Sequence, residues 1–219
     1  MEIIKSCLIL LSLILFCSCS SNQSLNDINK KISTLNSMSN EKPIKSFTRE
    51  MLKHINYPLI EVKTNGVLIQ ALMLPISQRD NYSYYSSGSG QTIVFNGAII
   101  SKTNGININL ISVELEQQQY LSSLIYPQKP LLASKKIYSY LTADNKINIK
   151  EFFCKYKFGE KETINIVGIE FDLVRFIEKC KNDKSSFTNI YWLDENGFIW
   201  KSNQWLNDEV EAKITIINP

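Results

Sequence analysis

The sequence is poor in the side chains that most catalytic and metal sites need. It has one histidine, His54, and no glycine loop of the kind that cradles phosphate. The stretch 86–90, SSGSG, lacks the Gly-x-Ser-x-Gly frame of a nucleophile elbow, because Ser86 stands where the first glycine belongs. Histidine, cysteine and carboxylate residues do not gather at the spacing of metal ligands. We therefore expect no catalytic residue, no metal and no cofactor.

Long apolar runs and an excess of one charge are missing as well. The apolar run from Cys7 to Phe16 is too short to cross a bilayer, since a membrane helix needs about 20 apolar residues. A formal net charge of +3 is too small to indicate a nucleic acid or an acidic partner. The full sequence is 44% apolar, and the chain beyond this run is long enough for one hydrophobic core.

The N-terminus has the features of a secretory signal that ends at a cysteine. The apolar run suits the core of such a signal, and the small residue Ser18 directly precedes Cys19. This boundary, FCSCSSN, resembles a bacterial lipobox, in which the cysteine becomes the acylated first residue of the mature chain. Cys17 fits less well, because it follows the bulky Phe16. The alternative is a leader that is cut elsewhere, with Cys19 as a spare thiol.

The lipobox implies a division of the chain into three parts. Residues 1–18 would be removed as a signal peptide, residues 19–45 would form a polar tether, and residues 46–219 would form a single β-rich periplasmic domain. Two or more acyl chains on Cys19 would anchor the protein stably to a membrane. Similarity to enteric lipoproteins implies the outer membrane, because Ser20 stands where an aspartate would signal inner-membrane retention. The domain is expected to face the periplasm, and exposure at the cell surface stays open.

Only two cysteines remain after the lipobox, Cys154 and Cys180. In an oxidising periplasm, a lone pair in one domain most simply forms a disulfide, which would contribute roughly 3–4 kcal/mol by closing its loop. Two buried free thiols are the alternative. A redox-active pair is disfavoured because the Cys-x-x-Cys spacing is absent.

The chain beyond Pro58 has the alternation of antiparallel strands. The dipeptide Asn-Gly, which tolerates the positive φ angles of tight hairpin turns, occurs at 65–66, 96–97, 104–105 and 196–197. We predict an all-β fold, an antiparallel sandwich or partly open barrel of about ten strands, with one short helix within residues 45–57.

Three stretches show which face of a strand points into the core. Alternation over 151–158 places Cys154 on the apolar face, together with Phe152, Tyr156 and Phe158. Similar alternation over 167–173 and 210–216 predicts two more strands, each with one apolar face.

Two stretches resemble a known family. The end of the chain, FTNIYWLDENGFIWKSNQWLNDEVEAKITIINP, with GIEFDLVRFIEKC before it, resembles the C-terminal region of the group 4 capsule polysaccharide lipoproteins, the GfcB/YjbF family. FNGAIISKTNGININL resembles the family's central Gly…Thr-x-Gly stretch. The resemblance covers residues 45–219, and it departs from the family at Ala98, where an arginine is expected.

The resemblance implies a non-enzymatic accessory in the assembly or export of capsule or exopolysaccharide at the outer membrane. Its expected partners are an outer-membrane barrel protein, a soluble periplasmic protein and polysaccharide. One alternative is a periplasmic glycan-processing enzyme that uses paired carboxylates, such as Glu170 with Asp172 or Asp194 with Glu195. Another is a purely structural envelope lipoprotein.

The hairpin around Asn196-Gly197 supplies the candidate contacts for a glycan or a partner. With that dipeptide as the turn, Leu193 pairs with Trp200 and Trp192 pairs with Lys201. One face would then carry Tyr191, Leu193, Phe198 and Trp200 into the core. The other face would carry Trp192, Asp194 and Lys201, the candidate contacts, with Trp205 as a further candidate. The alternative is that Trp192 packs under a loop and stacks on the stem of Lys201.

Overall fold

The computed structural model describes residues 48–219 apart from 54, 66–68, 107 and 116–132. Within these residues the chain forms a one-turn helix and twelve strands that belong to one antiparallel sheet. The elements are α3 Arg49–Leu52, β1 Leu59–Thr64, β2 Ile69–Arg79, β3 Tyr82–Ser87, β4 Thr92–Asn96, β5 Ile99–Asn104, β6 Leu110–Leu115, β7 Ala133–Leu141, β8 Ile147–Ile166, β9 Ile169–Lys181, β10 Ser186–Leu193, β11 Ile199–Trp205 and β12 Glu211–Asn218.

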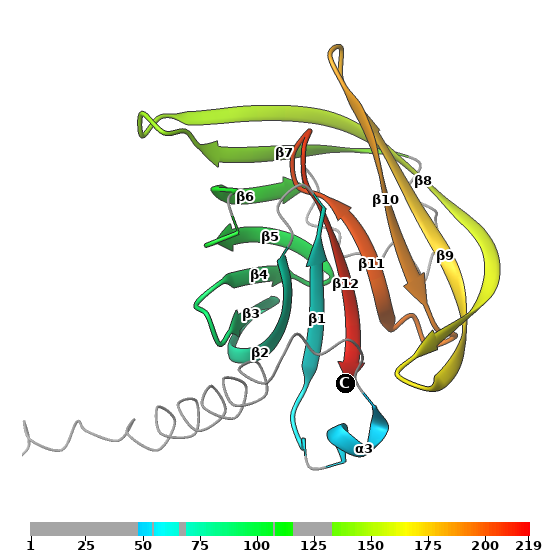
Figure 1. Ribbon diagram of the computed structural model, residues 1–219. Coiled ribbons are helices and arrows are strands. Elements are labelled where there is room, and N and C mark those ends of the chain that lie inside the picture. Colours follow the sequence, from blue (N-terminus) through cyan, green and yellow to red (C-terminus); the bar gives the residue numbers. More distant parts are fainter. Residues whose placement is uncertain (1–47, 54, 66–68, 107, 116–132) are drawn as a thin grey trace, which may run out of the picture.

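The sheet curls into a nearly closed barrel. Its hydrogen-bonded order is β5-β4-β3-β2-β1-β12-β11-β10-β9-β8-β7-β6. The two end strands, β5 and β6, lie side by side, so that the barrel has a seam between them (Figure 1). The prediction of an antiparallel, partly open barrel is therefore confirmed, with twelve strands in the described part of the chain.

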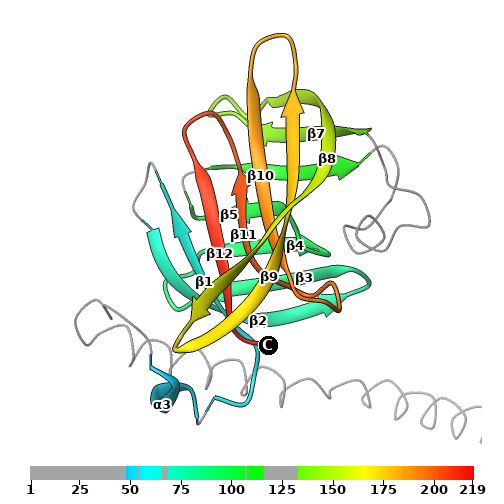
Figure 2. The same ribbon diagram turned by 90° about the vertical axis from the view of Figure 1, so that its right-hand side faces the viewer.

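The two ends of the barrel differ in what lies beside them. The C-terminus, α3 and the β8–β9 turn lie at one end, and the β9–β10 turn projects from the other (Figures 1 and 2). Arg49 fastens α3 to the barrel by donating hydrogen bonds to the carbonyl oxygens of Ile166, Val167 and Ile217, at 3.0, 3.0 and 3.3 Å. We call these the α3 end and the β9–β10 end.

The predicted helix is present but short. Four residues, Arg49–Leu52, form it, and within the described part of residues 45–57 none of the others is helical. A helix of one turn is unstable alone, so α3 depends on its packing against the barrel. Leu52 and Ile55 pack with Leu59, Leu74 and Ile217 in a small cluster that is separate from the barrel core. In the described part of the chain, no helix has the length and apolarity of a membrane span.

The Asn-Gly dipeptides mark turns, although not always in the expected way. Gly97 has a φ of 60° and Asn96 pairs with Ile99, so the β4–β5 turn is Gly97-Ala98, with glycine at its first central position. The turn at 104–105 does not form a hairpin, because β5 and β6 stand at opposite ends of the hydrogen-bonded order. β1 and β2 pair as expected around Asn65, while 66–68 lie outside the described residues.

Strand alternation predicts the inward face of β8 in its first half only. Phe152 and Cys154 are fully buried, as expected, whereas Phe158 is 50% exposed. The pairing of β8 with β9 shifts register between Phe158 and Lys161, and such a shift changes which side chains face inward. The strand expected over 167–173 is present from Ile169 onward, while Val167 and Gly168 have positive φ and form the β8–β9 turn instead. In β12, Ala212 and Ile214 are buried as predicted.

Candidate functional site

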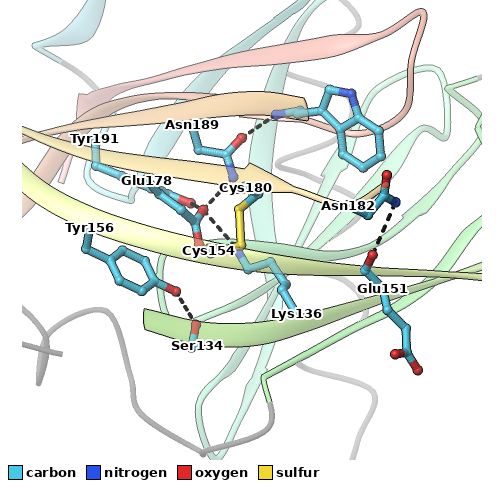
Figure 3. The surroundings of a disulfide bond; sticks show 11 residues. Ser134, Lys136, Glu151, Cys154, Tyr156, Glu178, Cys180, Asn182, Asn189 and Tyr191 are labelled. Carbon is cyan, nitrogen blue, oxygen red and sulfur yellow. Dashed lines mark hydrogen bonds and ion pairs between the residues drawn. A yellow bond between two sulfur atoms is a disulfide. The ribbon is translucent and has the colours of Figure 1, made fainter. Parts of the chain in front are cut away.

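The barrel interior at the β9–β10 end contains a buried ion pair. Lys136 of β7 and Glu178 of β9 are both 0% exposed, and the Lys136 Nζ lies 2.8 Å from each carboxylate oxygen. Asn189 donates to Glu178 Oε2 at 2.6 Å, and the Tyr191 hydroxyl donates to the same oxygen at 3.4 Å. Figure 3 shows these side chains converging beside the disulfide. A buried charge is stable only with such partners. Removing any one of these side chains would therefore leave another buried group without its partner.

Burial and the negative charge of Glu178 raise the pKa values of the tyrosines around this pair. The pKa values of Tyr138 and Tyr191 lie well above the ordinary 10.0, and burial is the larger cause and the Glu178 carboxylate the second. The same two causes raise the pKa of Tyr156, whose hydroxyl lies 2.5 Å from Ser134 Oγ. These phenols therefore stay neutral in the folded protein across the physiological range.

The predicted disulfide lies next to the ion pair. Cys154 and Cys180 face each other in the β8–β9 register, are buried, and are bonded to each other (Figure 3). Their sulfurs and a Glu178 oxygen lie within 4.8 Å of one another, a spacing that could suit a metal. Both sulfurs are already bonded and the carboxylate is held by Lys136, so this grouping is structural.

Trp205 belongs to the packed core of the same end. It is 6% exposed, and its ring stacks on Phe187 with centroids 4.2 Å apart and planes 3° apart. Tyr138 and Phe152 meet it edge to face at 5.0 and 5.2 Å. Its backbone nitrogen donates to Asn189 Oδ1 at 2.7 Å, which ties the aromatic cluster to the ion pair. A glycan contact by Trp205 stays a prediction, and this ring has little free surface for one.

Trp192 lies on the outer face of the hairpin, opposite Lys201 as predicted. The Lys201 Nζ lies 4.9 Å from the ring centroid, and the indole N–H donates to Glu162 Oε1 at 2.6 Å. Arg175 Nε lies 3.2 Å from the same oxygen. Trp192 is only 8% exposed, so its surroundings are those of the packing alternative. Whether it touches a glycan or a partner stays a prediction.

The β10–β11 turn differs from the predicted one by a single residue. Tyr191 pairs with Ser202 and Trp192 with Lys201, as expected, but Leu193 pairs with Ile199, so the predicted pairing of Leu193 with Trp200 is wrong.

Asp194 causes this shift. Its Oδ1 accepts the backbone N–H groups of Asn196 and Phe198, each at 2.9 Å, and its backbone nitrogen donates to the Phe198 oxygen at 3.0 Å. The loop therefore has three residues and ends at Gly197, with a φ of 79°, and not at a two-residue Asn-Gly turn.

The shifted register moves two aromatic residues away from the packed core. Tyr191 and Leu193 are buried as predicted, whereas Phe198 is 41% exposed and Trp200 is partly exposed. Their expected place in the core is therefore corrected. An aspartate two residues before Asn196 was the available signal, because Asp side chains hydrogen-bond to the backbone two residues on.

Trp200 instead lines a cleft of about 400 Å³ at the α3 end of the barrel. We call it the mouth cleft. Its floor is formed by inward side chains of β1 and β12. Its walls are formed by the β2–β3, β4–β5 and β10–β11 turns, which come together there. Representative lining residues are Ile60, Ile214, Tyr85, Asn81, Ala98 and Trp200.

Hydrogen bonds across the barrel hold the walls of the mouth cleft. Gln204 of β11 donates to the Ala98 carbonyl oxygen at 2.8 Å and accepts from the Ile100 nitrogen at 2.9 Å. The Gly97 nitrogen donates to the Asn81 carbonyl oxygen at 2.9 Å, which joins the β4–β5 turn to the β2–β3 turn. The cleft is therefore a fixed feature of the barrel, because its walls are bonded to one another.

Four of the expected features lie outside the described residues: the signal peptide 1–18, Cys19, the tether 19–45 and His54. The candidate carboxylates are described. Asp172 accepts from Thr163 at 2.7 Å and lies 3.2 Å from Lys161, and these contacts lower its pKa. The mouth cleft was missed because neither strand pattern nor composition says which turns meet in space.

These features define a class of protein: an antiparallel, nearly closed barrel with a packed interior at one end and a cleft at the other. A family model described as group 4 capsule polysaccharide lipoprotein GfcB, YjbF matches residues 32–217. The chain belongs to this family, as the sequence resemblance predicted, and is thus a lipoprotein of capsule polysaccharide systems.

The comparisons with individual proteins support the fold. The crystal structure of the hypothetical lipoprotein YmcC from Escherichia coli K12 is similar, with a TM-score of 0.71 over 92% of this chain and 98% of that one. The two chains are 17% identical, so this likeness shows the fold alone. A search of curated proteins found no match.

Proposed function

We propose that the protein is a lipid-anchored outer-membrane lipoprotein that assists the assembly or export of capsule or exopolysaccharide without catalysing a reaction. The family match over residues 32–217 is the observation that carries this proposal. The domain would face the periplasm and act beside an outer-membrane barrel protein and a soluble periplasmic protein. The lipobox at Cys19 supports the anchor.

The state of the carboxylates supports a non-enzymatic role. A glycosidase needs one carboxyl group with a raised pKa to act as general acid. The pKa of Asp172 is lowered, first by its hydrogen bond from Thr163 and then by Lys161, so Asp172 does not suit the role of general acid. Asp194 is occupied by the turn and by the Trp200 indole N–H at 3.0 Å, and Glu178 is wholly buried. Each is held in a structural contact.

Gene deletion with complementation tests the role. We expect deletion to lower surface polysaccharide, and we expect full restoration by the wild-type gene. The double variant Glu170→Gln/Asp172→Asn and the single variant Glu195→Gln should restore it equally, because charge removal leaves the packing in place and Asp194, which holds the β10–β11 turn and Trp200, is kept. Failure of either variant, with normal protein level, would support the glycan-processing alternative. An unchanged polysaccharide level after deletion would support a purely structural role.

Labelled palmitate tests the anchor. Label should enter the wild-type protein in the outer-membrane fraction and should be absent from Cys19→Ala. Cys17→Ala is the matched control and should be labelled normally, because Cys17 lies in the removed segment. Equal labelling of Cys19→Ala would contradict the assignment.

A further inference from the structure

We propose that the mouth cleft binds a sugar residue of the polysaccharide, with Trp200 as the aromatic surface against which the sugar ring packs. This inference rests on the proposed role in polysaccharide assembly and assigns that role a site. The volume of the mouth cleft, about 400 Å³, lies within the range of small-ligand sites, roughly 300–1,000 Å³.

Trp200 is held in a fixed position at the cleft. Its indole N–H donates to Asp194 Oδ2 at 3.0 Å, and the same carboxylate organises the β10–β11 turn. Phe171 packs on the ring with centroids 4.2 Å apart, and Phe198 meets it edge to face at 5.0 Å. Since Phe171 covers one face and the N–H already has an acceptor, what Trp200 offers to the cleft is apolar ring surface. Such a surface suits the C–H face of a pyranose.

Polar groups also line the mouth cleft. Asn81 and Ser83 line the cleft from the β2–β3 turn and β3, and within the described part of the chain their side chains have no hydrogen-bond partner. Ser202 lines it from β11, next to the Gln204 amide that braces the wall. A rigid aromatic ring with amide and hydroxyl groups nearby matches a molecule that is apolar on its ring face and carries hydroxyls at its rim.

The stretches that carry the family resemblance meet at this cleft. Gly97 and Ala98 come from the central stretch, and Gly197, Phe198 and Trp200 from the C-terminal one. Ala98, whose side chain is only a methyl group, lines the cleft. Trp192, by contrast, is covered by Lys201 and bonded to Glu162, so the outer face of the same hairpin offers less free ring.

Binding of the full-length protein to polysaccharide tests the site. The probe is polysaccharide purified from the surface of the source bacterium, cut to labelled oligosaccharides, and the protein is kept in detergent. Trp200→Ala should weaken binding at least about tenfold, as expected for an aromatic residue at the centre of a site. Ala98→Trp should block binding, because it fills the cleft and removes no existing side-chain bond. Trp192→Phe is the matched control and should bind like the wild type.

Each outcome decides between the alternatives. Wild-type affinity in both Trp200→Ala and Ala98→Trp would overturn the proposal, as would wild-type protein that binds no oligosaccharide. Loss of binding in Trp192→Phe alone would move the site to the outer face. A labelled fatty acid is the second probe, and its binding in place of the sugar would show an acyl-chain site. Deletion phenotypes are independent, so the proposed function can stand when this site fails.

Discussion

The two ends of the barrel interior are built from the same strands and have opposite characters. At the β9–β10 end, Lys136, Glu178, Trp205 and the disulfide leave all their groups paired or packed. At the α3 end, the interior opens into the mouth cleft. Strand β11 contributes to both, with Trp205 buried at one end and Trp200 at the cleft. The packed end can therefore maintain the fold, while the interior at the other end is left open.

Removing one partner of the ion pair should have the largest effect. Lys136→Met leaves Glu178 buried with no cation, and we expect a loss of about 3–5 kcal/mol in the free energy of unfolding. The double variant Lys136→Met/Glu178→Gln leaves no charge and should lose clearly less than the single one. Urea unfolding measures both. Equal losses would show that the pair is not a coupled unit.

Opening the disulfide should come next. Cys154→Ala/Cys180→Ala removes a link between residues 26 positions apart, and we expect a loss of roughly 2–4 kcal/mol. The single variant Cys19→Ala is the control, since it should leave unfolding of the domain unchanged. Mass spectrometry of non-reduced peptides should show residues 154 and 180 joined. Free thiols at both positions in periplasm-derived protein would contradict the pairing.

High pH should weaken the packed end, where three buried or partly buried tyrosines surround Glu178. The pKa values of Tyr138, Tyr156 and Tyr191 are raised by burial and by Glu178, so their stabilising contribution is fully present below pH 10. Above pH 10 the unfolded chain releases these protons and the folded one keeps them, so stability falls as pH rises. Absorbance at 295 nm should show a group of tyrosines that ionise only on unfolding. Ionisation of all ten near pH 10 in the folded protein would contradict this.

Trp200→Ala should have the smallest effect on stability. The ring is partly exposed and packs against Phe171 and Phe198, so we expect a loss of about 1 kcal/mol. Trp205→Ala, on the same strand, should lose about 3–5 kcal/mol because it leaves a cavity in the core. Thermal unfolding of the pair measures the contrast. Equal losses would show that the two ends are not energetically distinct.

The sequence alone determined the class of fold, the pair of cysteines and much of the strand pattern. Side-chain alternation has a period of two, and Asn-Gly marks turns, so both can be recognised without knowing what lies opposite. This local information placed Cys154 and Tyr191 inside and paired Trp192 with Lys201. The family resemblance in the central and C-terminal stretches was also a property of the sequence and is confirmed by the family match.

The tertiary structure decided the long-range contacts, which local sequence patterns do not specify. Lys136 lies 42 positions from Glu178, and nothing in β7 alone shows that a lysine there faces the core. Asp194 shifted the register by accepting backbone hydrogen bonds, which moved Trp200 from the predicted core to the cleft. Gln204 reaches Ala98, 106 positions away, and so sets the cleft walls. Burial and cavities depend on which strands and turns meet in space, and that is fixed only when the sheet closes.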